Sequence, residues 1–205
     1  MKRKEQKEYT KQLIFKSAVE LFRKQGFQNT TVQQITDHAG VAKGTFFNYF
    51  HSKESVLHLV GQSQLKLLHS FYEEVIYSNE SIEESLHKLF KFMAIKNEEY
   101  GPILLLSIFH ISTAVKDFQT SESLLASEFR SILINLIEEG QKRGEFTEQA
   151  NSSRIATLIV NSFFGTLFYW VHHSEYETLP ALLHDVITCY ITVLKSRSPL
   201  PDSRC

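Results

Sequence analysis

The sequence predicts an all-α protein, with an N-terminal helix-turn-helix domain followed by a larger helical domain. Apolar residues recur every three to four positions along most of the 205 residues, which is the period of helices that bury one face. No stretch alternates apolar and polar residues for long enough to indicate a strand, and no Asn-Gly or Asp-Gly dipeptide indicates a hairpin. The four prolines stand at positions 102, 180, 199 and 201, where they can begin a helix or lie in a tail. We expect about nine helices.

The first helix is predicted from about residue 10 to residue 25. Ile14, Ala18 and Phe22 recur at the spacing of one buried stripe. Gly26 follows, and glycine adopts the left-handed conformation that ends many helices without a steric penalty. The stripe predicts that this helix packs against its neighbours with one face.

The next two helices are short and closely spaced. The second opens with TVQQ, where Thr31 and Gln34 can form a reciprocal capping box, and it ends at Gly40. A third helix of about two turns is predicted over residues 43–49 after a tight turn. Two short helices joined by a glycine-containing turn are typical of a helix-turn-helix.

The remainder of the chain predicts longer helices. Ser52 is expected to cap the first of them. Further helical patterns cover residues 81–99, 102–115, 122–142, 152–173 and 179–196. We therefore expect a helix-turn-helix domain over residues 1–51, an effector-binding and dimerisation domain over residues 52–197 and a flexible tail over residues 198–205.

Charge is unevenly divided along the chain. Residues 1–60 carry ten Lys or Arg and five Asp or Glu, whereas residues 61–205 carry twelve and eighteen. A net charge of +5 on the first part and −6 on the second indicates that only the N-terminal part meets a polyanion. A chance distribution of surface charge is the alternative.

Several classes of protein are disfavoured. Cys189 and Cys205 are the two cysteines, which is too few for a disulfide framework or a zinc site, so we expect a reducing, cytoplasmic setting. The basic N-terminus is not followed by the apolar run of a secretory signal. The longest apolar stretch, near Ile103–Ile111, is too short to span a bilayer. The HExxH, GxSxG, GxGxxG, P-loop and CxxC patterns are absent from the sequence, so we expect no enzyme activity, cofactor or metal.

The third predicted helix is unusually aromatic. Phe46 and Phe50 are four residues apart and share one face, so we assign both to the core. Phe47 and Tyr49 then lie toward the other side of the helix. The less favoured alternative is that these two side chains also pack into the core. In a helix-turn-helix the second helix enters the major groove and its residues reach base edges.

The polar residues of this helix suit duplex DNA. Lys43 can donate to guanine or phosphate, Asn48 can pair with adenine, and the methyl group of Thr45 can contact thymine. Gly44 permits close approach of the backbone, and Phe47 and Tyr49 can contact sugars or thymine methyls. Gln33 can reach a flanking base, and Lys53 can bind phosphate near the start of the fourth helix.

Residues Thr30 to Leu57, TTVQQITDHAGVAKGTFFNYFHSKESVL, resemble the signature of the TetR family of one-component transcriptional regulators. The preceding LFRKQGFQNTTV has the family's arrangement of glycine, aromatic residue and two threonines. The resemblance is close over about the first 60 residues. It implies an all-α homodimer of nine or ten helices, in which three helices bind operator DNA and the others form a ligand pocket and a dimer interface.

The resemblance also implies which residues contact DNA. Phe47 stands where a tyrosine is usual, and Asn48–Tyr49 replaces a pair that is often rich in histidine, so no operator sequence can be carried over. The implied DNA contacts, with Thr31 and Lys53 at phosphate positions, are Thr31, Gln33, Lys43, Gly44, Thr45, Phe47, Asn48, Tyr49 and Lys53.

An effector pocket is expected among the fourth to eighth helices. The sixteen phenylalanines favour an apolar or aromatic small molecule. Each of these side chains could instead belong to an ordinary core. The candidates for the lining are Phe71, Phe90, Met93, Phe109, His110, Phe129, Leu133, Phe163, Phe164 and Tyr169.

The last two predicted helices are apolar on nearly all sides. The resemblance implies that they pair with their copies across a two-fold axis, and a two-fold axis suits a palindromic operator. Burial within one domain core is the alternative. The expected interface residues are Leu158, Gly165, Phe168, Leu183, Ile187, Tyr190, Ile191 and Leu194.

The sequence thus predicts a ligand-responsive transcriptional regulator, expected to be a repressor. It would bind a palindromic operator as a homodimer and be released or retuned by a small apolar effector. The alternative is a DNA-binding scaffold whose C-terminal part binds a protein partner.

Overall fold

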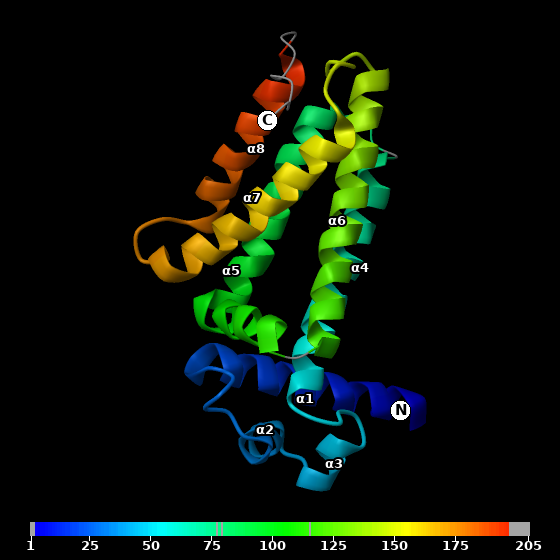
Figure 1. Cartoon of the computed structure of the whole chain (residues 1–205). Coiled ribbons are helices and arrows are strands. Elements are labelled where there is room, and N and C mark those ends of the chain that lie inside the picture. The colour runs from blue at the N-terminus through cyan, green and yellow to red at the C-terminus, as the bar shows by residue number, and fades with distance from the viewer. Residues whose placement is uncertain (1–2, 77, 79, 115, 197–205) are drawn as a thin grey trace. The chain divides into compact units, whose positions relative to one another are not determined.

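The computed structural model describes residues 3–76, 78, 80–114 and 116–196, and it describes their side chains except at 76 and 109–124. Every regular element in these residues is an α-helix (Figure 1). The all-α prediction is therefore confirmed. In chain order the helices are α1 (Arg3–Gln25), α2 (Val32–Ala39), α3 (Lys43–Phe47), α4 (Glu54–Ile76), α5 (Ile82–Ala114), α6 (Lys116–Lys142), α7 (Ser152–His173) and α8 (Leu179–Lys195).

Helix α5 is interrupted near its middle. Gly101 has φ 75° and ψ 161°, which is not helical, and Pro102 follows it. Pro102 lacks the N–H that a continuous helix needs, and glycine tolerates the positive φ. The break separates the two helices predicted over 81–99 and 102–115. With it, the described residues hold nine helical stretches.

Three predicted helix starts differ from the structure. Helix α1 begins at Arg3 instead of about residue 10. Helix α6 begins at Lys116 instead of residue 122, because the intervening sequence contains no glycine or proline that would delay it. Helix α4 begins at Glu54. Its start is supported by the Ser52 N–H donating to Ser55 Oγ at 3.3 Å, so Ser55 supplies the side-chain acceptor there, and the cap predicted from the Ser52 side chain is wrong.

Residue contacts divide the chain into two compact units. The first comprises Met1–Ser63 and Tyr100–Glu122, and the second comprises Gln64–Glu99 and Ser123–Cys205. The predicted division at residue 51 stays a prediction, and the predicted tail lies outside the described residues. Within the first unit, the Phe27 N–H donates to Ser107 Oγ at 3.4 Å, which shows why part of α5 belongs with the N-terminal helices.

The core of the first unit is built by the stripe predicted for α1. Side chains of α1 pack with those of α2, of α3 and the residues after it, and of α4 and α5. The buried residues of this core are Ile14, Ala18, Phe22, Phe27, Ile35, Ala39, Phe46, Phe50, Val56, Leu57 and Leu104.

The second unit contains α7 and α8 side by side (Figure 1). The Asn151 side chain accepts the Arg154 N–H at 2.9 Å and caps α7, and Pro180 stands in the first turn of α8. Both helices bury an apolar stripe along their length.

Helix α7 is long and apolar enough, by length and composition, to cross a membrane. The sequence-based expectation considered the shorter stretch near Ile103–Ile111 and missed this longer apolar helix. A core helix passes the same test, and Ile155, Ile159 and Phe163 on one face of α7 are buried within the second unit.

Candidate functional site

The helix-turn-helix is fixed by local hydrogen bonds. Thr31 Oγ1 accepts the Gln34 N–H at 3.2 Å, and Gln34 Oε1 accepts the Thr31 N–H at 2.8 Å. This is the predicted capping box. Gly40 ends α2 with φ 65°, a left-handed conformation that strains any residue with a Cβ. The Val41 N–H then donates to the Thr36 carbonyl at 3.0 Å, so the chain turns tightly into α3.

Helix α3 has one buried face and one wet face. Phe46 is fully buried and Phe50 nearly so, with their ring centroids 5.4 Å apart. Phe47 is 49% exposed and meets Phe46 edge-on. Placing Phe46 and Phe50 in the core was therefore correct, and the other side of this short helix is open to a partner.

The residues predicted to contact DNA divide by exposure. Gln33 Nε2 donates to Asp37 Oδ1 at 2.8 Å, so its amide is held on the surface of α2. Thr45, Tyr49 and Lys53 are half-buried. The exposed residues are Thr31, Gln33, Lys43, Gly44, Phe47 and Asn48.

Lys53 has a structural role that was not predicted. Its Nζ donates to the carbonyl oxygens of Phe27 and Thr30 at 2.8 and 3.0 Å and lies 4.2 Å from the Phe27 ring centroid. The ammonium thus holds the segment between α1 and α2 in place with two of its three N–H donors. A phosphate could accept a hydrogen bond only from the third N–H. Lys53 lies 26 positions from Phe27 and 23 positions from Thr30 in the sequence. Local sequence patterns therefore could not predict these hydrogen bonds.

Replacing Lys53 by methionine is expected to lower the free energy of unfolding by about 1–3 kcal/mol, because two partly buried carbonyls lose their donor. Urea unfolding followed by circular dichroism measures this loss. The matched control is Lys16→Met on the exposed side of α1, expected to change stability by about 0.5 kcal/mol or less. Unchanged stability with weaker DNA binding would show that Lys53 serves phosphate alone.

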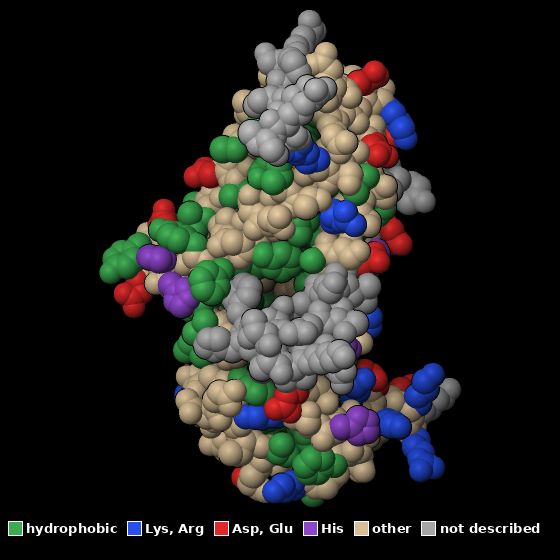
Figure 2. Space-filling view, in the orientation of Figure 1, with side chains coloured by type: hydrophobic (Ala, Val, Ile, Leu, Met, Phe, Trp, Pro, Cys, Tyr) green, Lys and Arg blue, Asp and Glu red, His purple; other side chains and the backbone are tan. Residues whose placement is uncertain are grey.

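A second feature missed by sequence reasoning is a cationic groove beside α3. Lys4, Lys7 and Lys11 of α1 line a groove of about 530 Å³ together with Glu8, Asn48 and Tyr49. Figure 2 shows Lys and Arg side chains gathered where α1 begins. The spacing of the three lysines could have been noticed as a backward continuation of the buried α1 stripe.

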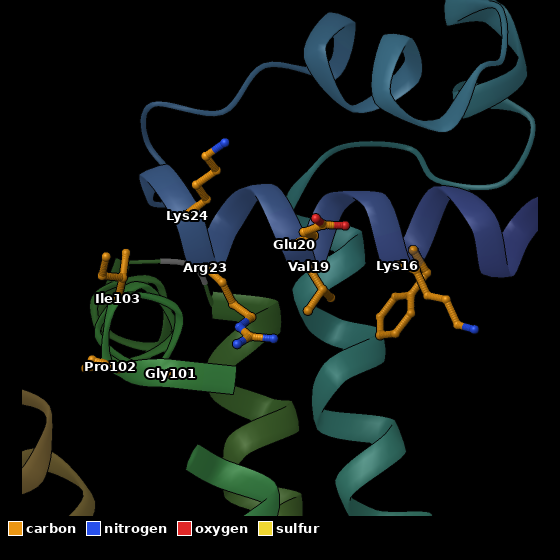
Figure 3. A pocket seen from close by; sticks show the side chains of 9 residues that line it. Lys16, Val19, Glu20, Arg23, Lys24, Gly101, Pro102 and Ile103 are labelled. Carbon is orange, nitrogen blue, oxygen red and sulfur yellow. The ribbon is translucent and has the colours of Figure 1, made fainter. Parts of the chain in front are cut away.

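The other side of α1 borders a different groove, of about 700 Å³ (Figure 3). Phe15, Val19, Pro102 and Ile103 give it an apolar lining, and Lys16 and Arg23 extend along it in the view of Figure 3. No predicted site residue lies there. Lys16 and Arg23 are therefore basic residues of α1 that do not border α3.

The candidate effector residues of the second unit largely come together. The rings of Phe90, Phe129 and Phe163 meet one another at centroid distances of 6.0, 5.9 and 5.1 Å, and Phe164 lies 5.5 Å from Phe163. Met93 and Leu133 are also buried. Phe71 stacks on Phe92 at 5.7 Å. We name Phe90, Phe129, Phe163 and Phe164 the aromatic cluster.

Tyr169, another candidate, does not lie in that cluster. Tyr169 is exposed: its hydroxyl donates to Glu177 Oε2 at 3.1 Å and its ring stacks on His173 at 4.2 Å. Its prediction as a pocket residue is wrong, because it lies on the wet face of α7. The side chains of Phe109 and His110 lie outside the described residues.

The residues predicted to form the dimer interface are partly buried and partly exposed. Leu183, Ile187, Ile191 and Leu194 form the buried stripe of α8, so in this structure they pack within their own protomer and the prediction that they meet a partner is wrong. The Tyr190 hydroxyl is hydrogen-bonded to Ser162 Oγ at 2.8 Å. Exposed on α7 are Leu158, Gly165 and Phe168.

His87 and His184 form a histidine pair on α5 and α8. Their ring centroids are 4.8 Å apart, and His87 Nδ1 is buried without a hydrogen-bond partner among the described residues. Burial, followed by the charges of His184 and Lys195, lowers the pKa of His87, and Glu83 opposes this by raising it.

Stability is expected to fall on acidification because of His87. Its pKa is lower in the folded state, so the unfolded chain binds more protons and stability is lost as the pH drops below about 6.5. His87→Gln should flatten the dependence of the unfolding free energy on pH between about 7 and 5. His51→Gln, exposed in the first unit, is the control. Equal slopes in wild type and His87→Gln would contradict this assignment.

Two family models match the chain. Bacterial regulatory proteins, tetR family, matches residues 14–60, and QacR-like protein, C-terminal region, matches residues 72–196. The Bacillus subtilis fatty acid metabolism regulator protein is 22% identical over 185 residues, covering 90% of this chain and 95% of that protein.

Solved structures share the fold. FadR of Thermus thermophilus, described as a TetR-family transcriptional repressor in complex with lauroyl-CoA, has a TM-score of 0.67 and 24% identity, covering 93% of this chain and 98% of that one. Bacillus subtilis FadR in complex with stearoyl-CoA has a TM-score of 0.74 and 21% identity, covering 88% and 97%. With the helix-turn-helix and the matched helical C-terminal region, these findings show that the chain belongs to the tetR family of bacterial regulatory proteins and is a DNA-binding transcriptional regulator.

Proposed function

We propose that this regulator represses transcription by binding a palindromic operator as a homodimer in the cytoplasm, and that a long-chain acyl thioester such as an acyl-CoA releases it. The observation that carries the DNA-binding part is the exposed face of α3, held outward by the buried Phe46 and Phe50. The acyl thioester is proposed because FadR proteins of the same fold are described as complexes with lauroyl-CoA and stearoyl-CoA.

In this proposal the wet face of α3 reads the major groove. Lys43 donates to guanine O6 and N7 or to phosphate, and Asn48 pairs bidentately with adenine. The Thr45 methyl group contacts a thymine methyl, while Gly44 lets the backbone approach. Around them, Gln33, Phe47 and Tyr49 contact flanking bases and sugars, and Thr31 and Lys53 face phosphates.

The acyl chain would occupy the region of the aromatic cluster. Its members come from α5, α6 and α7 and bury apolar surface against one another. A hydrocarbon chain can replace these contacts without loss of burial, because both are apolar. An acyl chain that separates the rings would shift the helices that carry them. The effector would then make different contacts with the shifted and unshifted conformations, and this difference in affinity is what moves the equilibrium between them.

The dimer would form through the exposed face of α7. Leu158, Gly165 and Phe168 recur at seven and ten residues on one helix face. A Cβ placed on Gly165 would meet nothing within 4 Å, so a second helix can approach closely there. A two-fold dimer presents two recognition helices to the two halves of a palindrome.

Selection of a duplex from a random pool, followed by titration with acyl-CoA, tests this function. Lauroyl-CoA or stearoyl-CoA should weaken binding to the selected duplex by about 5–150-fold, the usual range of allosteric coupling, whereas CoA alone should not. Phe129→Trp, which crowds the aromatic cluster, should reduce the effect. Binding that no acyl-CoA changes would contradict the effector class, and absence of any duplex binding would contradict the operator.

A further inference from the structure

The first three turns of α1 present a row of lysines beside the recognition helix. Lys4, Lys7 and Lys11 line one groove with Asn48 and Tyr49. Lys4 and Lys7 are exposed and Lys11 is half-buried. This row is continuous with the surface assigned to base contacts, although it comes from a different helix.

The row lies on the face of α1 that points toward α2 and α3. With about 100° of rotation per residue, positions 4, 7 and 11 fall in the same arc of about 80° as Ile14, Ala18 and Phe22. Those three residues are buried in the core of the first unit. The stripe therefore changes from apolar to cationic where α1 extends beyond that core.

Among the described residues that line the groove, three lysines stand beside one acid, so the charge of this row is only partly compensated there. Glu8 is the one acid lining the groove, and its Oε1 accepts from Gln12 Nε2 at 3.2 Å. Among the described residues, no hydrogen bond or ion pair to Lys4, Lys7 or Lys11 is found. Like charges three and four residues apart destabilise a helix, so a polyanion bound along the row would relieve that repulsion.

The spacing suits one strand of a duplex. Lys4 and Lys11 are separated by about 10 Å along the helix, at about 1.5 Å per residue. Phosphates of one DNA strand rise about 3.4 Å per nucleotide along the duplex axis, so three lysines spread over about 10 Å, each on a flexible stem, can reach neighbouring phosphates of one strand. Lysine contributes a flexible point charge, which suits phosphate better than a base edge.

We propose that Lys4, Lys7 and Lys11 bind consecutive backbone phosphates that flank the base pairs read by α3. The lysine row then adds affinity without sequence preference and sets the angle at which α3 enters the groove. This proposal rests on the DNA-binding function of the protein and adds a contact surface on α1 to it.

The test compares two double variants of the full chain that carry the same loss of charge on the same helix. Lys7→Gln/Lys11→Gln removes two of the three lysines of the row. Lys16→Gln/Arg23→Gln removes two cations that line the groove of Figure 3. Fluorescence anisotropy measures the affinity of each for the duplex selected by the wild type and for a mixed-sequence duplex, between about 50 and 200 mM salt.

The row predicts a distinctive result for Lys7→Gln/Lys11→Gln. Its affinity for both duplexes should fall by the same factor, about tenfold or more at about 0.15 M salt, and the slope of log K against log salt should flatten by about one unit per phosphate contact removed. Lys16→Gln/Arg23→Gln should keep the wild-type slope. Circular dichroism should show equal helicity in both variants.

Equal slopes in the two double variants would overturn the lysine row while leaving operator binding intact. A loss confined to the selected duplex would also overturn it, because phosphate contacts act on every sequence. A wild-type protein that binds neither duplex at low salt would instead contradict the DNA-binding function itself, so the two failures are distinguishable.

Discussion

Phe46→Ala is expected to lower the free energy of unfolding by about 3–5 kcal/mol, because it removes a fully buried ring from a close-packed core. Its ring centroid lies 5.4 Å from those of Phe47 and Phe50. The ring packs in a core to which α1, α2, α4 and α5 also contribute side chains. A typical domain is stable by only 5–15 kcal/mol. We therefore expect the first unit of this variant to be largely unfolded at moderate temperature and to bind no duplex.

The control for this prediction is the neighbouring phenylalanine. Phe47 is 49% exposed, so Phe47→Ala should change the free energy of unfolding by about 1 kcal/mol or less while weakening duplex binding. Amide hydrogen exchange locates the loss, since amides of α1 to α3 should lose protection in Phe46→Ala alone. Similar losses of stability in both variants would contradict the division of α3 into a buried and a wet face.

Phe168→Glu is expected to convert the dimer into monomers and to weaken operator binding by about 100-fold or more. The side chain is 52% exposed in one protomer, and we propose that the partner covers it. A carboxylate there would be buried twice across the two-fold axis without a cation, at a cost of several kcal/mol. Loss of the dimer also separates the two half-site contacts, whose combined affinity depends on their linkage.

Sedimentation equilibrium measures the association directly. The matched control is Tyr176→Glu, at an aromatic side chain that is 82% exposed and lies beyond the end of α7. It should remain dimeric and bind duplex as the wild type does. A Phe168→Glu protein that stays dimeric at micromolar concentration would show that this face of α7 is not the interface.

Features fixed by neighbouring residues could be predicted from the sequence. The capping box at Thr31 and Gln34, the left-handed Gly40 and the burial of Phe46 and Phe50 each depend on residues within four positions of one another. The local hydrogen-bonding and helical period decide these features, so distant parts of the chain do not alter them.

Features that depend on distant packing could not be predicted. Leu183 and Ile187 face inward because α7 lies beside α8, yet the apolar stripe of α8 is equally suited to a partner helix. Helix α7 is apolar on nearly every side, so its sequence could not show that Tyr169 is wet. The bonds of Lys53 join residues more than twenty positions apart.

The central claim is that the exposed face of α3 reads a duplex, and the binding of Asn48→Ala to DNA tests it most directly. Asn48 is exposed, so the variant should fold as the wild type does. We predict that its affinity for the duplex selected by the wild type falls by about 1–3 kcal/mol, with little change on a mixed-sequence duplex. Wild-type affinity of Asn48→Ala for the selected duplex would contradict the account.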